Sequence, residues 1–246
     1  MHERNQKKDL VLLPGLDGTE VFFQPLLNAL SEFSRTRMVC FPTSGSNAYP
    51  ELLSVVRSAV SELSDYYVIA WSFSAPLALM LAAAEPEKVR GIILFASFVR
   101  PPLRLLPLLK FGCVPPVIWT IRFSRRIPIW LRHRRSDPLR RAKADLWNRI
   151  DARILTARVR AIIALDAREL LRRCQVPILY IAGSRDRVVP RHNVHEIVRL
   201  KPSVRVRTIL GGHFAIYQNP AASAAAIAAF VRDCTSNADW EIQNAS

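Results

Sequence analysis

The chain has 246 residues, half of them hydrophobic, and a formal net charge of +15. This length suits one open α/β domain with an insertion, and the hydrophobic content is enough for a sizeable core. No apolar run reaches the roughly 18 residues that a membrane-spanning helix needs, and no secretory signal is present, so a cytoplasmic protein is expected. The four cysteines match no metal-binding spacing, so we expect neither a metal nor a cofactor.

Short apolar runs alternate with stretches of helical spacing along the first hundred residues. Strands are predicted at 10–14, 38–41, 66–71 and 91–95, and helices at 21–30, 51–63 and 73–84. After an interruption, strands follow at 178–182 and 204–209, with helices at 191–200 and from Pro220 to about Cys234. Six strands that alternate with helices predict a mainly parallel sheet with helices on both faces.

The interruption defines the expected domain organisation. Residues 100–173 contain 19 Lys and Arg but only five Asp and Glu, so this segment carries almost the whole charge excess. We expect residues 9–99 and 174–234 to form the core, residues 100–173 a basic helical insertion, and residues 235–246 a flexible tail. An insertion after the fourth strand would lie over the carboxyl edge of the sheet, where open sheets place their sites.

A serine lies where the third predicted strand runs directly into a helix. Ser72 has Ala70 two residues before it and Ser74 two residues after it. A turn this sharp forces the nucleophile into a strained conformation and accepts only small flanking residues. The pattern A-x-S-x-S departs from the usual G-x-S-x-G but keeps its steric logic. The alternative is a serine that caps an ordinary helix.

A serine nucleophile needs a base, and the base needs an acid that orients it. His213 follows the last predicted strand in a Gly-Gly-His loop, and Asp186 follows the fifth strand. The order serine, acid, histidine is the order expected on this kind of sheet. The backbone N–H groups of Phe73 and Leu16 are the predicted donors of an oxyanion hole.

These motifs resemble the α/β-hydrolase superfamily over about residues 9–234. The nucleophile turn, the acid loop from Gly183 to Pro190 and the segment Gly212-His-Phe214 carry the resemblance. The run from Leu165 to Pro190 is similar to small carboxylesterases that cleave the methyl ester of pimeloyl-carrier-protein in biotin synthesis. The loop from Pro14 to Thr19 instead resembles lipid acyltransferases of the same superfamily. The resemblance implies an α/β-hydrolase fold in which residues 100–173 form a helical lid.

The lid sequence mixes apolar and aromatic residues with arginines, which suggests an acyl chain in the pocket. We expect the pocket to be lined by aromatic side chains: Trp71, Trp119, Phe123 and Phe214. The candidate partner-binding residues are Arg122, Arg125, Arg126, Arg140 and Arg141. They would meet either an acidic acyl carrier protein or an anionic membrane surface, or simply point to water. No reader motif accompanies the charge, so a nucleic-acid partner is not expected.

Three functions are compatible with the sequence. The first is a serine esterase that hydrolyses an acyl ester or thioester through an acyl-enzyme. The second is an acyltransferase that uses the same Ser72, His213 and Asp186 but passes the acyl group to a lipid or alcohol. The third is a binding protein that kept the fold without catalysis. The complete set of serine, acid and histidine favours the first two.

Overall fold

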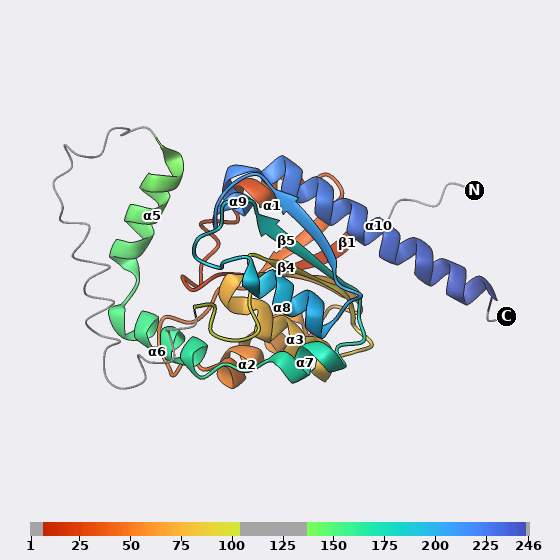
Figure 1. Cartoon of the computed structure of the whole chain (residues 1–246), viewed down its shortest axis with the longest axis horizontal. Helices are drawn as coiled ribbons and strands as arrows, with labels where there is room; N and C mark the ends of the chain where they lie inside the picture. Colours follow the sequence, from red (N-terminus) through yellow and green to blue (C-terminus); the bar gives the residue numbers. More distant parts are fainter. Residues whose placement is uncertain (1–6, 104–136, 245–246) are drawn as a thin grey trace.

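The computed structural model describes residues 7–103 and 137–244, and a six-stranded sheet forms its centre (Figure 1). The strands are β1 (Lys8–Leu13), β2 (Ser34–Met38), β3 (Tyr66–Trp71), β4 (Val89–Phe95), β5 (Ile178–Gly183) and β6 (Arg205–Ile209). Their order across the sheet is β2-β1-β3-β4-β5-β6, and each pair of neighbours is parallel. The predicted fold class is therefore confirmed.

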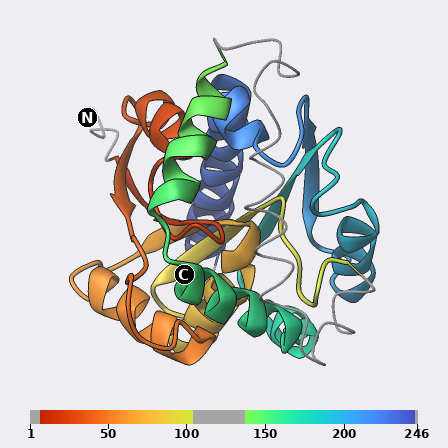
Figure 2. The ribbon, with the colours of Figure 1, turned by 90° about the vertical axis from the view of Figure 1, so that its left-hand side faces the viewer.

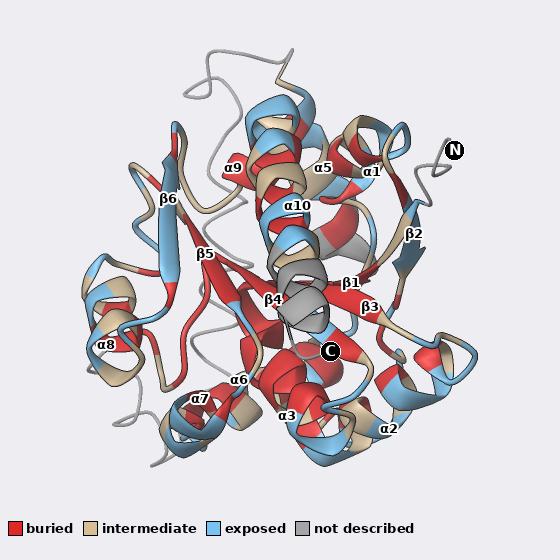
Figure 3. Ribbon diagram, turned by 90° about the vertical axis from the view of Figure 1, so that its right-hand side faces the viewer, coloured by how far each residue is buried: buried red, intermediate tan, exposed pale blue. Residues whose placement is uncertain are grey.

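Helices cover both faces of the sheet (Figure 3). One face packs against α1 (Gln24–Leu30), α9 (Ala215–Gln218) and α10 (Pro220–Asn244). The other packs against α2 (Tyr49–Val60), α3 (Ala75–Ala84), α7 (Arg168–Arg173) and α8 (His192–Leu200). The central strand β3 is buried at all six residues because it is covered on both faces, which explains its continuous apolar sequence.

Two helices of the basic insertion lie across the end of the sheet at which the strands finish (Figures 1 and 2). They are α5 (Pro138–Arg149) and α6 (Ala152–Ile163). An aspartate, Asp137 or Asp151, caps the start of each helix. Its side chain accepts a hydrogen bond from a backbone N–H of the first helical turn. The insertion's last helix, α7, packs against the core instead, because its Leu171 is fully buried and α7 contacts α3.

Some predicted boundaries were wrong. The second strand is β2, Ser34–Met38, rather than 38–41, because this edge strand exposes three of its residues and therefore has no apolar pattern. The buried Val39 and Phe41, which suggested the strand, lie in the loop after it. The last helix continues to Asn244, beyond its predicted end near Cys234, because no glycine or proline follows Pro220.

Among the described residues, no helix has both the length and the apolar character that crossing a membrane requires.

Candidate active site

Ser72 occupies the sharp turn between β3 and α3. A single 3-10 turn, Ser72–Ser74, joins the two elements, and Ser72 has a φ of 52°, in the left-handed region that non-glycine residues rarely adopt. Ala70 is fully buried, and the hydroxyl of the buried Ser74 donates a hydrogen bond to the carbonyl oxygen of Pro14. The strained serine and its small, closely packed flanking residues agree with the geometry expected of a nucleophile.

His213 and Asp186 are in direct contact. His213 Nδ1 lies 2.9 Å from Asp186 Oδ2, and the two side chains are only 9% and 6% exposed. Asp186 Oδ1 accepts the backbone N–H groups of Val188 and Val189, which fixes the carboxylate. The proton of the neutral imidazole therefore belongs on Nδ1, facing the carboxylate, and Nε2 is left as the base.

The two loops that carry these residues are joined by backbone hydrogen bonds. The N–H of Ser184 donates to the carbonyl of Ile209, and the N–H of Arg185 donates to Gly211 at 2.8 Å. β5 and β6 are parallel neighbours, so their ends lie side by side at one edge of the sheet. Parallel pairing thus places Asp186 and His213 together although 27 residues separate them.

Ser72 and His213 line the same cavity, which has a volume of about 300 Å³. The indole Nε1 of Trp71 donates to the backbone carbonyl of His213 at 3.3 Å, and the two rings lie 5.5 Å apart. The residue before Ser72 therefore holds the histidine loop directly. Among the hydrogen bonds of the described residues, none joins Ser72 to the His213 ring; such bonds commonly tighten only when substrate binds.

The predicted oxyanion donors lie near Ser72. Phe73 follows Ser72 in the 3-10 turn, and Leu16 lines the cavity together with Gly15 and Asp17. Within the described part of the chain, the N–H of Leu16 has no hydrogen-bond acceptor, so it is available to a ligand. The carbonyl of Phe73 accepts a hydrogen bond from the phenolic hydroxyl of Tyr49 at 3.0 Å. This contact fixes the backbone next to the Phe73 N–H.

Aromatic side chains form one wall of the cavity. Trp71 and Phe214, both expected to line the pocket, do so, and their rings lie 5.3 Å apart. Phe22 packs edge-on against both of them. Lys143 of α5 also lines the cavity, with its Nζ 3.5 Å from the centre of the Phe214 ring. The site is therefore an apolar pocket that holds few polar groups, as acyl-binding pockets do.

Several predicted residues lie outside this geometry. Trp119, Phe123, Arg122, Arg125 and Arg126 fall within 104–136, outside the described residues. Arg140 and Arg141 are exposed on α5. In the described ranges, no group of three or more His, Cys, Asp or Glu side chains has an arrangement that could hold a metal ion.

Two cationic residues at this edge of the sheet were not predicted from the sequence. Lys143 reaches the cavity, and the fully buried Arg158 of α6 contacts the loop that contains Leu16. Arg158 stands four residues from both Ile154 and Ile162, which are buried. An arginine at the apolar positions of a helix is unusual, and this spacing was the available signal.

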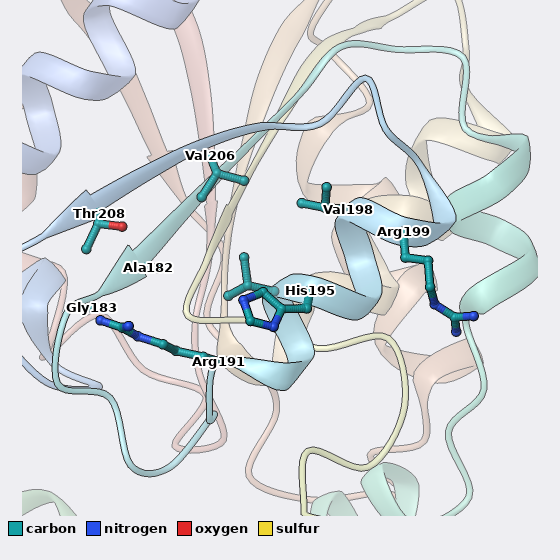
Figure 4. Close-up of a pocket in the computed structure, with 9 residues that line it drawn as sticks. Ala182, Gly183, Arg191, His195, Val198, Arg199, Val206 and Thr208 are labelled. Carbon is teal, nitrogen blue, oxygen red and sulfur yellow. The ribbon is translucent and has the colours of Figure 1, made fainter.

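A second, larger cavity of about 550 Å³ lies between α8 and the edge strand β6 (Figure 4). Val206 and Thr208 line it from β6, and His195 and Val198 line it from α8. None of the predicted site residues lines this larger cavity. Of the predicted catalytic residues, Ser72 and His213 line the smaller cavity instead, and Asp186 contacts His213 from behind it.

Comparisons with known proteins agree with this architecture. The sequence profile of the alpha/beta hydrolase family matches residues 10–226. A pimeloyl-[acyl-carrier protein] methyl ester esterase of Xanthomonas oryzae pv. oryzae is 29% identical over 220 residues, which cover 82% of this chain and 86% of that protein. A solved esterase of Exiguobacterium antarcticum has a TM-score of 0.76 at 18% identity and 92% coverage of both chains. An enol-lactonase of Burkholderia xenovorans LB400 has a TM-score of 0.72 at 16% identity and 94% coverage of both. The chain belongs to the alpha/beta hydrolase family.

Proposed function

We propose that this chain is a serine carboxylesterase in which Ser72, His213 and Asp186 form the catalytic triad. The observation that carries the proposal is the 2.9 Å contact between His213 Nδ1 and Asp186 Oδ2. His213 also lines the cavity that the strained Ser72 lines. The names of the relatives support hydrolysis of an ester. None of the relatives described above is an acyltransferase, so we propose water rather than a lipid or alcohol as the acyl acceptor.

The reaction proceeds through an acyl-enzyme. Ser72 Oγ attacks the ester carbonyl while His213 Nε2 takes the hydroxyl proton, and the N–H groups of Leu16 and Phe73 stabilise the oxyanion. The imidazolium then protonates the leaving alcohol as the carbon–oxygen bond breaks. Water, deprotonated by the same imidazole, attacks the acyl-enzyme. The imidazolium then returns the proton to Ser72 Oγ as the bond from the acyl carbon to Oγ breaks, which releases the acid and the free serine.

As the substrate we propose an acyl ester attached to an acyl carrier protein, of the pimeloyl methyl ester type. The similarity to the pimeloyl-[acyl-carrier protein] methyl ester esterases supports this class. The exposed Arg140 and Arg141 on α5 offer positive charge near the cavity to an acidic carrier protein. In this proposal α5 and α6 form a lid over the pocket, and a membrane surface is not required.

Labelling with a fluorophosphonate probe tests the nucleophile. The wild-type protein is expected to be labelled and to hydrolyse short p-nitrophenyl esters, whereas Ser72→Ala loses both properties because it has no attacking hydroxyl. Ser54→Ala, which changes an exposed serine on α2, is the matched control and keeps both. A wild-type protein that is neither labelled nor active would refute the esterase proposal.

The same assay tests the acid. Asp186→Asn is expected to lower kcat by about 10⁴-fold, because the amide cannot hold the imidazole in the required tautomer. Asp166→Asn, at an exposed carboxylate paired with Arg168, is the control. A loss smaller than tenfold for Asp186→Asn would mean that another residue supplies the acid.

A further inference from the structure

Arg158 is a fully buried cation that three hydrogen bonds hold in place. Its Nε donates to Asn47 Oδ1, its Nη1 to the carbonyl oxygen of Leu16 and its Nη2 to the carbonyl oxygen of Pro42, each at 3.0 Å. The side chain is 1% exposed and comes from α6 of the insertion. One guanidinium therefore joins the insertion to the loop after β1 and to the loop after β2.

The charge of this group is compensated inside the protein. Burial lowers the pKa of Arg158 to about 10, and the nearby carboxylate of Asp17 opposes that shift. Burial also raises the pKa of Asp17, although hydrogen bonds from Thr19 and the charge of Arg158 favour its ionised form. Arg158 thus remains a cation near neutral pH. A buried cation whose three nitrogens each have an acceptor is costly to remove, because its partners would be left unsatisfied.

The loop at Leu16 is held on both sides of the proposed oxyanion donor. The N–H of Leu16 shares a peptide plane with the carbonyl of Gly15, and that carbonyl accepts the N–H of Gly18 at 3.0 Å. The carbonyl of Leu16 belongs to the next peptide plane and accepts Arg158 Nη1. The first plane sets the direction of the Leu16 N–H, and Arg158 holds the second plane, which is joined to the first at the Leu16 Cα.

Gly18 shows how closely the guanidinium and the loop fit together. This residue has a φ of 74°, and a Cβ at this position would lie 2.6 Å from Arg158 Nη2 and closer still to Nη1. Only glycine both adopts the conformation easily and leaves room for the guanidinium. The loop is therefore built around the Arg158 side chain.

Phe73, which carries the second proposed oxyanion donor, is connected to Arg158 through Phe41. The Arg158 guanidinium lies 5.6 Å from the centre of the Phe41 ring, and the Phe41 ring lies 5.9 Å from that of Phe73. The backbone N–H of Phe41 also donates to the carbonyl of Gly18 at 2.8 Å. Both residues that carry proposed oxyanion donors thus pack against neighbours of Arg158.

We propose that Arg158 is a positioning residue for the oxyanion hole, through which helix α6 of the insertion holds the Leu16 amide in its productive direction. The inference rests on the proposed function, since it concerns how that site stabilises its tetrahedral intermediate. A misplacement of about 1 Å in a catalytic group reduces rates by about 10²-fold, so a distant buried arginine is able to control kcat without touching substrate.

Kinetics of Arg158→Ala and Arg158→Lys on a p-nitrophenyl ester test this role. We expect kcat to fall about 10- to 100-fold in Arg158→Ala, with KM changed less than threefold, because the oxyanion forms only after substrate has bound. Arg158→Lys keeps the charge and most of the volume but not the three-way donor geometry, so we expect an intermediate loss. Arg160→Ala, at an exposed arginine on the same helix, is the matched control.

A pair of inhibitors separates positioning from a merely structural role. A trifluoromethyl ketone adds to the serine and forms an oxyanion, whereas the corresponding methyl ketone binds largely without doing so. The expected result is that the Arg158 variants lose affinity for the trifluoromethyl ketone by the same factor as kcat, while affinity for the methyl ketone stays within threefold. Kinetics are normalised to the sites that fluorophosphonate labels, so that unfolded protein does not contribute.

Unchanged kcat per labelled site in Arg158→Lys, or equal losses for both ketones, would overturn the inference. Failure of the esterase proposal gives a different result, because the wild-type protein would then show neither labelling nor turnover. If Arg158→Ala does not fold, Arg158→Lys alone decides between the outcomes.

Discussion

Two glycines near His213 have very different surroundings. A Cβ on Gly183, the last residue of β5, would overlap the carbonyl oxygen of Gly212 and lie 3.0 Å from that of Gly211. A Cβ on Gly212 would meet only the carbonyl of Arg185, at 3.7 Å, which is an ordinary contact. The close approach at Gly183 is what allows the histidine loop to pack against the end of β5, beside the acid loop.

Gly183→Ala is therefore expected to be destabilising and to reduce activity. The added methyl group meets rigid backbone, so the two loops must separate and the contact between His213 and Asp186 must lengthen; we expect a loss of about 2 kcal/mol in the free energy of unfolding. Denaturant titration and kcat measure the two effects. Gly212→Ala is the control, expected to change stability by less than about 1 kcal/mol. Equal stability of the two variants would contradict this explanation.

At the scale of the element, the turn from β3 into α3 replaces both usual glycines by other small residues. Ala70 packs without any exposed surface, and Ser74 uses its hydroxyl to contact the carbonyl of Pro14 at the end of β1. The second serine thus ties the nucleophile turn to the loop that carries Leu16. The sequence A-x-S-x-S adopts this sharp turn because small size, rather than glycine itself, is what the packing requires.

Ser74→Ala tests this contact. Loss of the hydroxyl leaves the buried carbonyl of Pro14 without this donor, so we expect the free energy of unfolding to fall by about 1–3 kcal/mol. Ser54→Ala removes a hydrogen bond of the same type, from a serine hydroxyl to the carbonyl of Pro50, at an exposed position on α2. That control is expected to lose less than about 0.5 kcal/mol. Similar losses in both variants would show that the Ser74 hydroxyl has no special role.

At the scale of the whole molecule, positive charge is concentrated on one segment. Residues 100–173 contain 19 of the 35 Lys and Arg residues, and α5 and α6 of this segment lie at the edge of the sheet that holds the proposed site. Charge placed beside an active site accelerates the encounter with an oppositely charged partner, and salt weakens this effect.

The double variant Arg140→Glu with Arg141→Glu tests the acidic partner. We expect kcat/KM for an ester on an acyl carrier protein to fall at least tenfold, with the difference shrinking as ionic strength rises. The kcat/KM for a free p-nitrophenyl ester should remain within twofold, because neither residue lines the cavity. Equal effects on both substrates would argue against carrier-protein docking on α5.

The regular part of the fold was predictable because local patterns specify it. Central strands such as β3 are continuous apolar runs, and α2 and α8 have one apolar face each, so their existence follows from burial alone. The edge strand β2 was predicted at the wrong residues because Arg35, Thr36 and Arg37 are exposed, so this strand has no apolar pattern in the sequence. The candidate site could be proposed from the sequence because Ser72, Asp186 and His213 each lie shortly after the end of a strand.

By itself, the sequence determined the number of strands and their alternation with helices, the sharp turn at Ser72 and the side chains available for a triad, because each of these depends on neighbouring residues. Tertiary structure alone decided how the loops meet. Arg158 contacts Leu16, Pro42 and Asn47, which lie between 111 and 142 residues away along the chain. Pairing of a buried donor with distant carbonyls depends on how separate elements pack, and no local pattern encodes that.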